Sequence, residues 1–132
     1  MLSNIQLETI ERETFKGLNN LQTLIINGNQ LTEIDSNTFD DLTNLKSLSL
    51  NSNKLSKIDT NGLANLELLY LNNNEFTSIE REALKGLTNL KLLQMNFNKL
   101  DIIDEKAFDG LTNLQELSLN YNRLKTIDGE TF

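Results

Sequence analysis

The chain has 132 residues, of which 38% are hydrophobic and 23% charged, a balance that fits one soluble domain able to bury a core. It contains no His and no Cys, which removes most nucleophile–base pairs and transition-metal ligand sets, so neither a catalytic residue nor a metal or cofactor site is predicted. With 12 Lys and Arg against 19 Asp and Glu, the formal charge is −7, which disfavours nucleic acid and anionic lipid headgroups as partners.

The N-terminal residues, Met1–Glu8, lack the basic start and long apolar run of a signal peptide. No window approaches the roughly 18 apolar residues of a membrane span. The sequence as written therefore predicts no signal, no anchor and no direct membrane contact from this segment. The lack of Cys leaves the compartment open, because a longer secreted protein can carry its disulfides in flanking caps.

One unit with the pattern LxxLxLxxNxLxxIxxxxFxxL recurs along the chain. We expect a single domain over 1–132, with units at 2–20 (partial), 21–44, 45–65, 66–89, 90–113 and 114–132 (truncated). The period is 24 residues except from Leu45 to Leu66, where it is 21. Leu63 is expected to take the Phe position of this short unit, with the three missing residues just after it.

Each unit contains a Leu-x-Leu-like alternation, which predicts a short strand with one face turned inward. In chain order these strands are expected around 24–26, 48–50, 69–71, 93–95 and 117–119. One unit cannot bury its apolar side alone, so the units should stack their strands in parallel over a shared core. Phe15, Phe39, Phe108 and Phe132 should form one row of this core, with Leu63 and Leu84 substituting within it.

The repeated pattern resembles the leucine-rich repeat family, in the 24-residue variety typical of animal extracellular proteins such as Toll-like receptors, Slit and variable lymphocyte receptors. The resemblance runs from Leu2 to Phe132. It implies an α/β fold class, namely a leucine-rich repeat solenoid (a horseshoe arc). A parallel sheet would form its concave face, and loops or short 3-10 or helical turns would form its convex face.

An asparagine recurs at position nine of every full unit, counted from the first Leu, and we call this set the ladder asparagines: Asn29, Asn53, Asn74, Asn98 and Asn122. Ligand binding is one interpretation of such a polar row. A structural role is favoured, because a buried amide can donate and accept hydrogen bonds and so bridge the backbones of adjacent units. An acid also follows the Ile of each unit, and we expect these acids to cap the exposed amides of an outer turn.

If the family architecture holds, the variable positions of the strand segment project from the concave face, the usual binding surface of such solenoids. Apolar and aromatic side chains gather there in the units from Leu66 onward, a pattern that favours an interface over side chains that cover the core or that a missing neighbouring unit shields. The predicted partner-binding residues are Ile25, Leu68, Tyr70, Leu92, Gln94, Phe97, Glu116, Ser118 and Tyr121. An asparagine also recurs at position seven, where a hydrogen-bonding site for sugar or peptide is weighed against a small polar residue suited to a strand leaving the sheet.

The sequence therefore predicts a non-catalytic module that recognises an unidentified protein ligand. The resemblance implies an extracellular or cell-surface receptor, guidance, adhesion or immune protein, including innate immune signalling. Two alternatives are a regulatory subunit that stabilises a secreted enzyme and an intracellular repeat scaffold. Catalysis is disfavoured, because acid pairs such as Asp40 with Asp41 have no pocket to place them.

The chain begins inside a unit and stops at Phe132 without a polar closing unit. Uncapped solenoid ends tend to associate or fray. We therefore expect a piece of a longer protein, with possible self-association through its open ends.

Overall fold

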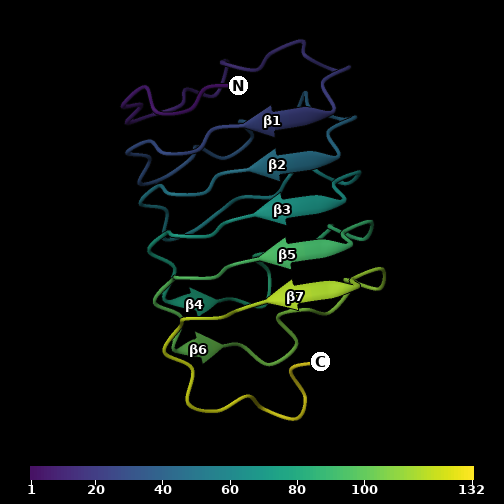
Figure 1. Cartoon of the computed structure of the whole chain (residues 1–132). Coiled ribbons are helices and arrows are strands. Elements are labelled where there is room, and N and C mark those ends of the chain that lie inside the picture. Colours follow the sequence, from purple (N-terminus) through teal and green to yellow (C-terminus); the bar gives the residue numbers. More distant parts are fainter.

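The computed structural model describes all 132 residues and contains strands and turns but no helix. The strands are β1 (Thr23–Ile25), β2 (Ser47–Ser49), β3 (Leu68–Tyr70), β4 (Ser78–Ile79), β5 (Leu92–Gln94), β6 (Ile102–Ile103) and β7 (Glu116–Ser118). The chain winds through one coil per repeat, and the coils pile up from the N-terminus to the C-terminus (Figure 1).

The main sheet has five parallel strands in the order β1-β2-β3-β5-β7. Its register aligns the central leucine of each strand with the central leucine of the next, as in Leu48 with Leu69 and Leu69 with Leu93. The strands lie one above another along one side of the stack (Figure 1). The predicted leucine-rich repeat solenoid with a parallel sheet is therefore confirmed.

The core lies directly behind this sheet and runs along the whole stack. Leu48, Leu69 and Leu93, at the strand centres, have no exposed surface. They belong to one continuous cluster of 27 buried hydrophobic residues. Truncating such a fully buried leucine to alanine costs about 2–5 kcal/mol of unfolding free energy, so these positions hold neighbouring repeats together.

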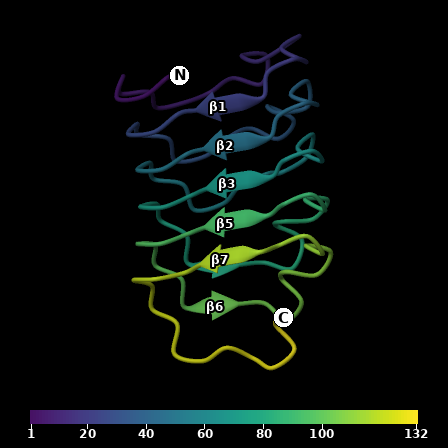
Figure 2. The ribbon, with the colours of Figure 1, turned by 45° about the vertical axis from the view of Figure 1, so that its right-hand side comes forward.

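The outer side of the stack consists of turns, which were one of the expected alternatives. Amides of these turns donate to the carbonyl three residues earlier, as from Thr14 to Glu11 at 3.0 Å and from Lys16 to Glu13 at 3.1 Å. Only every second residue makes such a bond, whereas a helix needs one at each successive residue, so the turns do not extend into a helix. A second, two-stranded parallel sheet, formed by β4 and β6, lies on this side and was not predicted (Figure 1). Figure 2 shows the five strands of the main sheet one above another, with β6 apart from them.

The short unit differs from the prediction in its register. Leu63 donates its amide to the carbonyl of Thr60 at 3.1 Å, just as Leu42 donates to Phe39 at 3.0 Å. Thr60 therefore occupies the Phe position, and Leu63 occupies the later leucine position. The expectation that Leu63 substitutes for Phe is wrong, because the three missing residues precede Thr60 and do not follow Leu63.

The row of phenylalanines is consequently interrupted in the middle of the stack. Phe15 and Phe39 stack with ring centroids 6.2 Å apart, and Phe108 and Phe132 stack at 5.3 Å. Between these two pairs the row holds Thr60 and Leu84. The smaller side chains reduce the filling of the outer core at the short unit.

Candidate functional site

The ladder asparagines bind the backbone of the preceding repeat, and all are buried except Asn122, which is half-buried. Asn74 is 4% exposed. Its Oδ1 accepts from the amide of Leu55 at 3.0 Å, and its Nδ2 donates to the carbonyls of Leu50 at 2.9 Å and Leu71 at 3.2 Å. Asn53, Asn98 and Asn122 make equivalent contacts one repeat away. Their hydrogen-bonding groups are used within the fold, so these amides do not face a ligand.

A second row of asparagines, at position seven, binds the backbone of the following repeat. The Oδ1 atom of Asn51 accepts from the amide of Asn72, and that of Asn72 accepts from the amide of Asn96, both at 2.8 Å. The Oδ1 atom of Asn96 accepts from the amide of Asn120 at 2.8 Å. These oxygens are committed within the fold, which weakens the interpretation of the row as a sugar or peptide site.

A third row of asparagines was missed by the sequence reasoning. It lies directly before the first leucine of each unit, where Asn44, Asn65, Asn89 and Asn113 donate their side-chain amides to carbonyls of the preceding repeat at 2.7–2.9 Å. The repeat pattern could have revealed this row, because an asparagine directly precedes the first leucine of every full unit. Three parallel rows of amides therefore join each repeat to its neighbours.

The acids that follow the Ile of each unit cap the outer turns in two of the units. Asp59 Oδ1 accepts from the amide of Asn61, and Asp128 Oδ1 accepts from the amide of Glu130, both at 2.9 Å. Asp104 instead accepts from the amide of Arg81 in the preceding repeat at 3.2 Å. These carboxylates therefore serve local structure by more than one route.

The open face of the main sheet carries a small apolar patch, which we call the strand patch and define as Leu68, Tyr70 and Leu92. Leu68 and Leu92 are register neighbours on β3 and β5, and all three side chains are half-buried. Glu116 is the exposed register neighbour of Leu92 on β7. Ile25 lies on β1 and is separated from β3 by β2, so it does not join the strand patch.

Two predicted partner-binding residues use their side chains inside the protein. Gln94 Oε1 accepts from Asn72 Nδ2 at 3.0 Å. Ser118 Oγ donates to Asn96 Oδ1 at 2.8 Å and accepts from Asn120 Nδ2 at 3.0 Å. Both residues therefore support the position-seven row as well as lining the open face.

Phe97 and Tyr121 form a separate feature beyond the strand ends, which we call the aromatic pair. Their rings stack with centroids 4.3 Å apart and planes 6° from parallel. Phe97 is 52% exposed and Tyr121 74% exposed, so the rings do not cover the core. Tyr70 stacks with neither ring, so the predicted cluster divides into the strand patch and the aromatic pair.

The backbone at the aromatic pair is left-handed. Phe97 has a φ of 56° and Tyr121 a φ of 57°. The same repeat position holds Gly28, Ser52 and Asn73, each also at positive φ. Glycine and asparagine adopt this region readily, whereas a bulky residue there costs about 1 kcal/mol or more.

Charged side chains line the edge where the strands begin. Glu67 lies between two lysines, with Lys91 Nζ at 2.7 Å and Lys46 Nζ at 3.9 Å from its carboxylate oxygens. The hydrogen bond from Lys91, together with its positive charge, lowers the pKa of Glu67. Both lysines are exposed and the Glu67 side chain is partly exposed, so solvent screens these interactions.

No group of three or more side chains of the metal-binding types is arranged to hold a metal ion. The structure also contains no helix of the length and apolar character that a membrane crossing requires.

The model of the protein family described as "Leucine rich repeat" matches residues 1–55 and 64–124 of the chain. The chain belongs to the leucine-rich repeat family. No curated protein matches it significantly.

Among solved structures, 154 chains match significantly. One belongs to a structure described as an octameric complex of Latrophilin 3 (Lec, Olf), Unc5D (Ig, Ig2, TSP1) and FLRT2 (LRR). The two chains are 32% identical with a TM-score of 0.88, and the match covers 95% of this chain and 39% of the other. The chain thus spans about two fifths of the length of the matched chain.

Proposed function

We propose that the chain is a non-catalytic recognition module of a cell-surface or secreted protein. It binds a protein partner through the open face of its sheet, with the strand patch at the centre and the aromatic pair beside it. Ile25 and Glu116 extend this surface along β1 and β7, while Gln94 and Ser118 mainly hold the neighbouring asparagines in place.

The aromatic pair carries the proposal. Phe97 and Tyr121 occupy left-handed backbone, where a smaller residue would cost less, and expose 52% and 74% of their surface. Mutual stacking of two rings contributes about 0.5–1.5 kcal/mol, which only offsets the backbone strain. The fold therefore gains little from these rings, whereas large amphipathic rings in contact with solvent are typical of interface hot spots.

The strand patch supports the same surface. Leu68 and Leu92 are adjacent on the only broad sheet of the molecule, on a face that no other element covers. An apolar patch with a polar surround, here Ser47 and Glu116 as register neighbours, has the composition of an interface core and rim.

The similarity to a leucine-rich repeat domain within a multi-protein complex supports a protein partner and a location outside the cell. The net charge of −7 favours a partner with a basic contact surface, because complementary charge accelerates association.

The test is direct binding of the purified chain to an array of extracellular domains that includes Latrophilin 3 and Unc5D. We expect saturable binding to at least one domain, weakened at least about tenfold by the double substitution Phe97→Asn with Tyr121→Asn, since each hot-spot residue contributes about 2 kcal/mol or more. Asn already occupies this repeat position at Asn73, so the variant keeps the local backbone.

The matched control is Ile102→Asn, which removes an equally exposed apolar side chain, 59% exposed, from β6 on the opposite side of the stack. It should leave binding unchanged. No saturable binding to any domain, or binding that the aromatic variant leaves intact while Ile102→Asn abolishes it, would overturn the proposal.

A further inference from the structure

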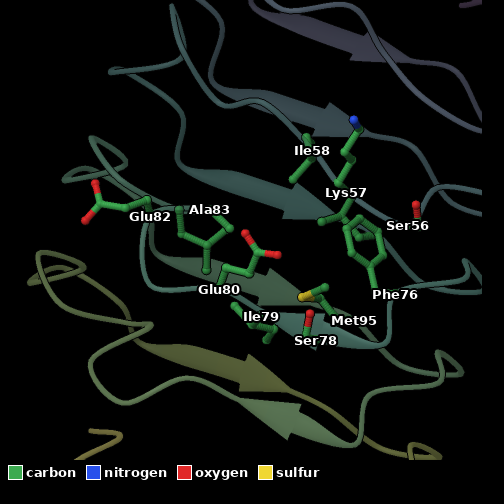
Figure 3. Close-up of a pocket in the computed structure, with 12 residues that line it drawn as sticks. Ser56, Lys57, Ile58, Phe76, Ser78, Ile79, Glu80, Glu82, Ala83 and Met95 are labelled. Atoms are coloured by element: carbon green, nitrogen blue, oxygen red, sulfur yellow. The ribbon is translucent and has the colours of Figure 1, made fainter.

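The short unit opens an apolar pocket on the outer side of the stack. The pocket has a volume of about 270 Å³ and lies between the short unit and the one that follows it. Its apolar lining includes Ile58, Phe76, Ile79 and Met95 (Figure 3), together with Leu71 and Leu84.

The pocket has an identifiable origin in the sequence. Phe39 lies five positions after Ile34, but Thr60 lies only two positions after Ile58, so the outer turn of the short unit lacks three residues. A threonine also stands where Phe39 and Phe108 fill the outer core of their repeats. Its Oγ1 lies 3.3 Å from the carbonyl oxygens of both Ala83 and Lys85, which share its single donor proton, and this contact holds the next outer turn in place beside the opening.

The backbone is open at the same place. β4 pairs with β6 through the amide of Asp104, which donates to the carbonyl of Ile79 at 3.0 Å. No backbone hydrogen bond joins β4 to residues 56–59 of the short unit. Adjacent residues of a parallel strand bond to opposite sides, so the amide and carbonyl of Ser78 face the pocket without a strand partner.

The charges at the opening are mainly negative. Glu80 and Glu82 line the pocket, and the Glu80 carboxylate lies among Ile58, Ile79 and Met95 (Figure 3). Glu80 makes no ion pair, whereas Glu82 pairs with Lys85 at 2.8 Å. Lys57 also lines the pocket, but its amino group lies at the far rim, away from the Glu80 carboxylate (Figure 3).

We infer that this pocket binds a small amphipathic amine, with its apolar body between Ile58, Leu84 and Met95 and its ammonium group on Glu80. An apolar cavity of about 150 Å³ is enough to hold benzene, so the larger volume here accommodates a phenyl ring with a short alkyl chain. The pocket is on the side opposite the proposed protein-binding face, so the two proposals stand or fall separately.

The experiment is a titration of the labelled protein with 4-phenylbutylamine, 4-phenylbutanol and 4-phenylbutanoate, followed by methyl and amide NMR. These probes share one apolar body and differ in charge. We expect dissociation constants on the order of 1 mM for the amine, as fits a ligand of this size, with shifts at Ile58, Ile79 and Met95. The amine should bind about two- to five-fold more tightly than the alcohol, because an exposed ion pair contributes up to about 1 kcal/mol. The carboxylate should bind most weakly.

Two variants separate the contributions of charge and shape. Glu80→Gln should remove the preference for the amine without changing the affinity for the alcohol, whereas Glu11→Gln, at the same repeat position of the first unit, should change neither. Leu84→Phe places in this row the residue that Phe39 and Phe108 hold and fills the pocket, so all three probes should bind at least about tenfold more weakly. Shifts confined to other residues, equal affinity for the carboxylate and the amine, or unchanged binding in folded Leu84→Phe would each overturn the inference.

Discussion

Asn74 donates its side-chain amide to the carbonyl of Leu50, 24 residues earlier, at 2.9 Å. The same side chain accepts from the amide of Leu55 at 3.0 Å, so it needs both its donor and its acceptor. Asn96, in the position-seven row, uses only its oxygen, which accepts from the Asn120 amide and the Ser118 hydroxyl. Asn74 and Asn96, which occupy repeat positions nine and seven, should therefore tolerate different substitutions.

Replacing each of these residues by Asp tests the difference. Asn74→Asp should destabilise the protein by about 3 kcal/mol or more, because it removes the donor and leaves a charge buried near unpaired carbonyls. Asn96→Asp keeps the acceptor at a half-buried site and should cost less than about 1 kcal/mol. Urea unfolding followed by circular dichroism measures both values, and equal losses of stability in the two variants would refute the assignment.

Thr60→Val tests the revised register of the short unit. The change keeps the shape of a buried side chain but removes the hydroxyl that donates to the carbonyls of Ala83 and Lys85. We expect a loss of about 1 kcal/mol in the free energy of unfolding. Thr77→Val, at an exposed threonine with no side-chain hydrogen bond, is the control and should be nearly neutral. A neutral Thr60→Val would mean that the hydroxyl has no structural role.

The Glu67–Lys91 pair predicts a specific dependence of stability on pH. Because the hydrogen bond and charge of Lys91 lower the pKa of Glu67 in the folded state, the pair stabilises the protein above the unfolded-state pKa of the carboxyl. That contribution is lost as the pH falls through the lowered folded-state pKa. Glu67→Gln should therefore flatten the acid side of the stability profile, and Lys91→Met should raise the pKa of Glu67 in a carboxyl NMR titration.

The control for this pH dependence is Glu33→Gln, since Glu33 is exposed and makes no ion pair. Its acid-side slope should match that of the unaltered protein. If Glu67→Gln also shows the unaltered slope, the ion pair does not persist in solution.

The aromatic pair should be needed for binding a partner but not for the stability of the fold. Phe97→Asn and Tyr121→Asn lose ring stacking but relieve left-handed backbone, so each should change the free energy of unfolding by less than about 1 kcal/mol. Chemical denaturation measures this change. A loss of more than about 2 kcal/mol from either substitution would show that the rings are needed for the fold and would remove the main support for a binding role.

The positions of the main strands follow directly from the sequence. The Leu-x-Leu alternation around Leu48, Leu69 and Leu93 places alternate side chains on opposite faces, and its recurrence in every unit sets the same register even where the period is 21 residues and not 24. These are local and repeated signals, so five repeats reinforce one another. The outer β4–β6 pair is only two residues long in each strand and has no comparable pattern.

The register of the short unit could not be predicted in the same way. The spacing from the preceding leucines favours Leu63 for the Phe position, but the spacing back from Leu66 favours Thr60. Packing decides between them, because Leu63 is 1% exposed and repeats the backbone contacts of Leu42. A prediction based on hydrophobicity alone does not place a threonine in a row of phenylalanines, so it misses Thr60.

The binding surface was predicted only as a group of residues at variable positions. Sequence spacing placed Tyr70 and Phe97 in one cluster, but the chain leaves the sheet between their repeat positions, so the rings do not meet. The hydrogen bonds of Gln94 and Ser118 depend on which rotamers their neighbours adopt. That information is not encoded in the repeat pattern.

The break between residues 56–59 and β4 also bears on how the molecule folds. In a linear array each coil is stabilised only by the coils beside it, so structure spreads from one neighbour to the next. β4 and β6 form the only outer strand pair, so the junction between their two coils is supported on both sides of the stack, whereas the junction at residues 56–59, like those before it, depends on the main sheet and its amide rows alone. The coils that carry β4 and β6 are therefore expected to open last, with slower hydrogen exchange than the coils before them.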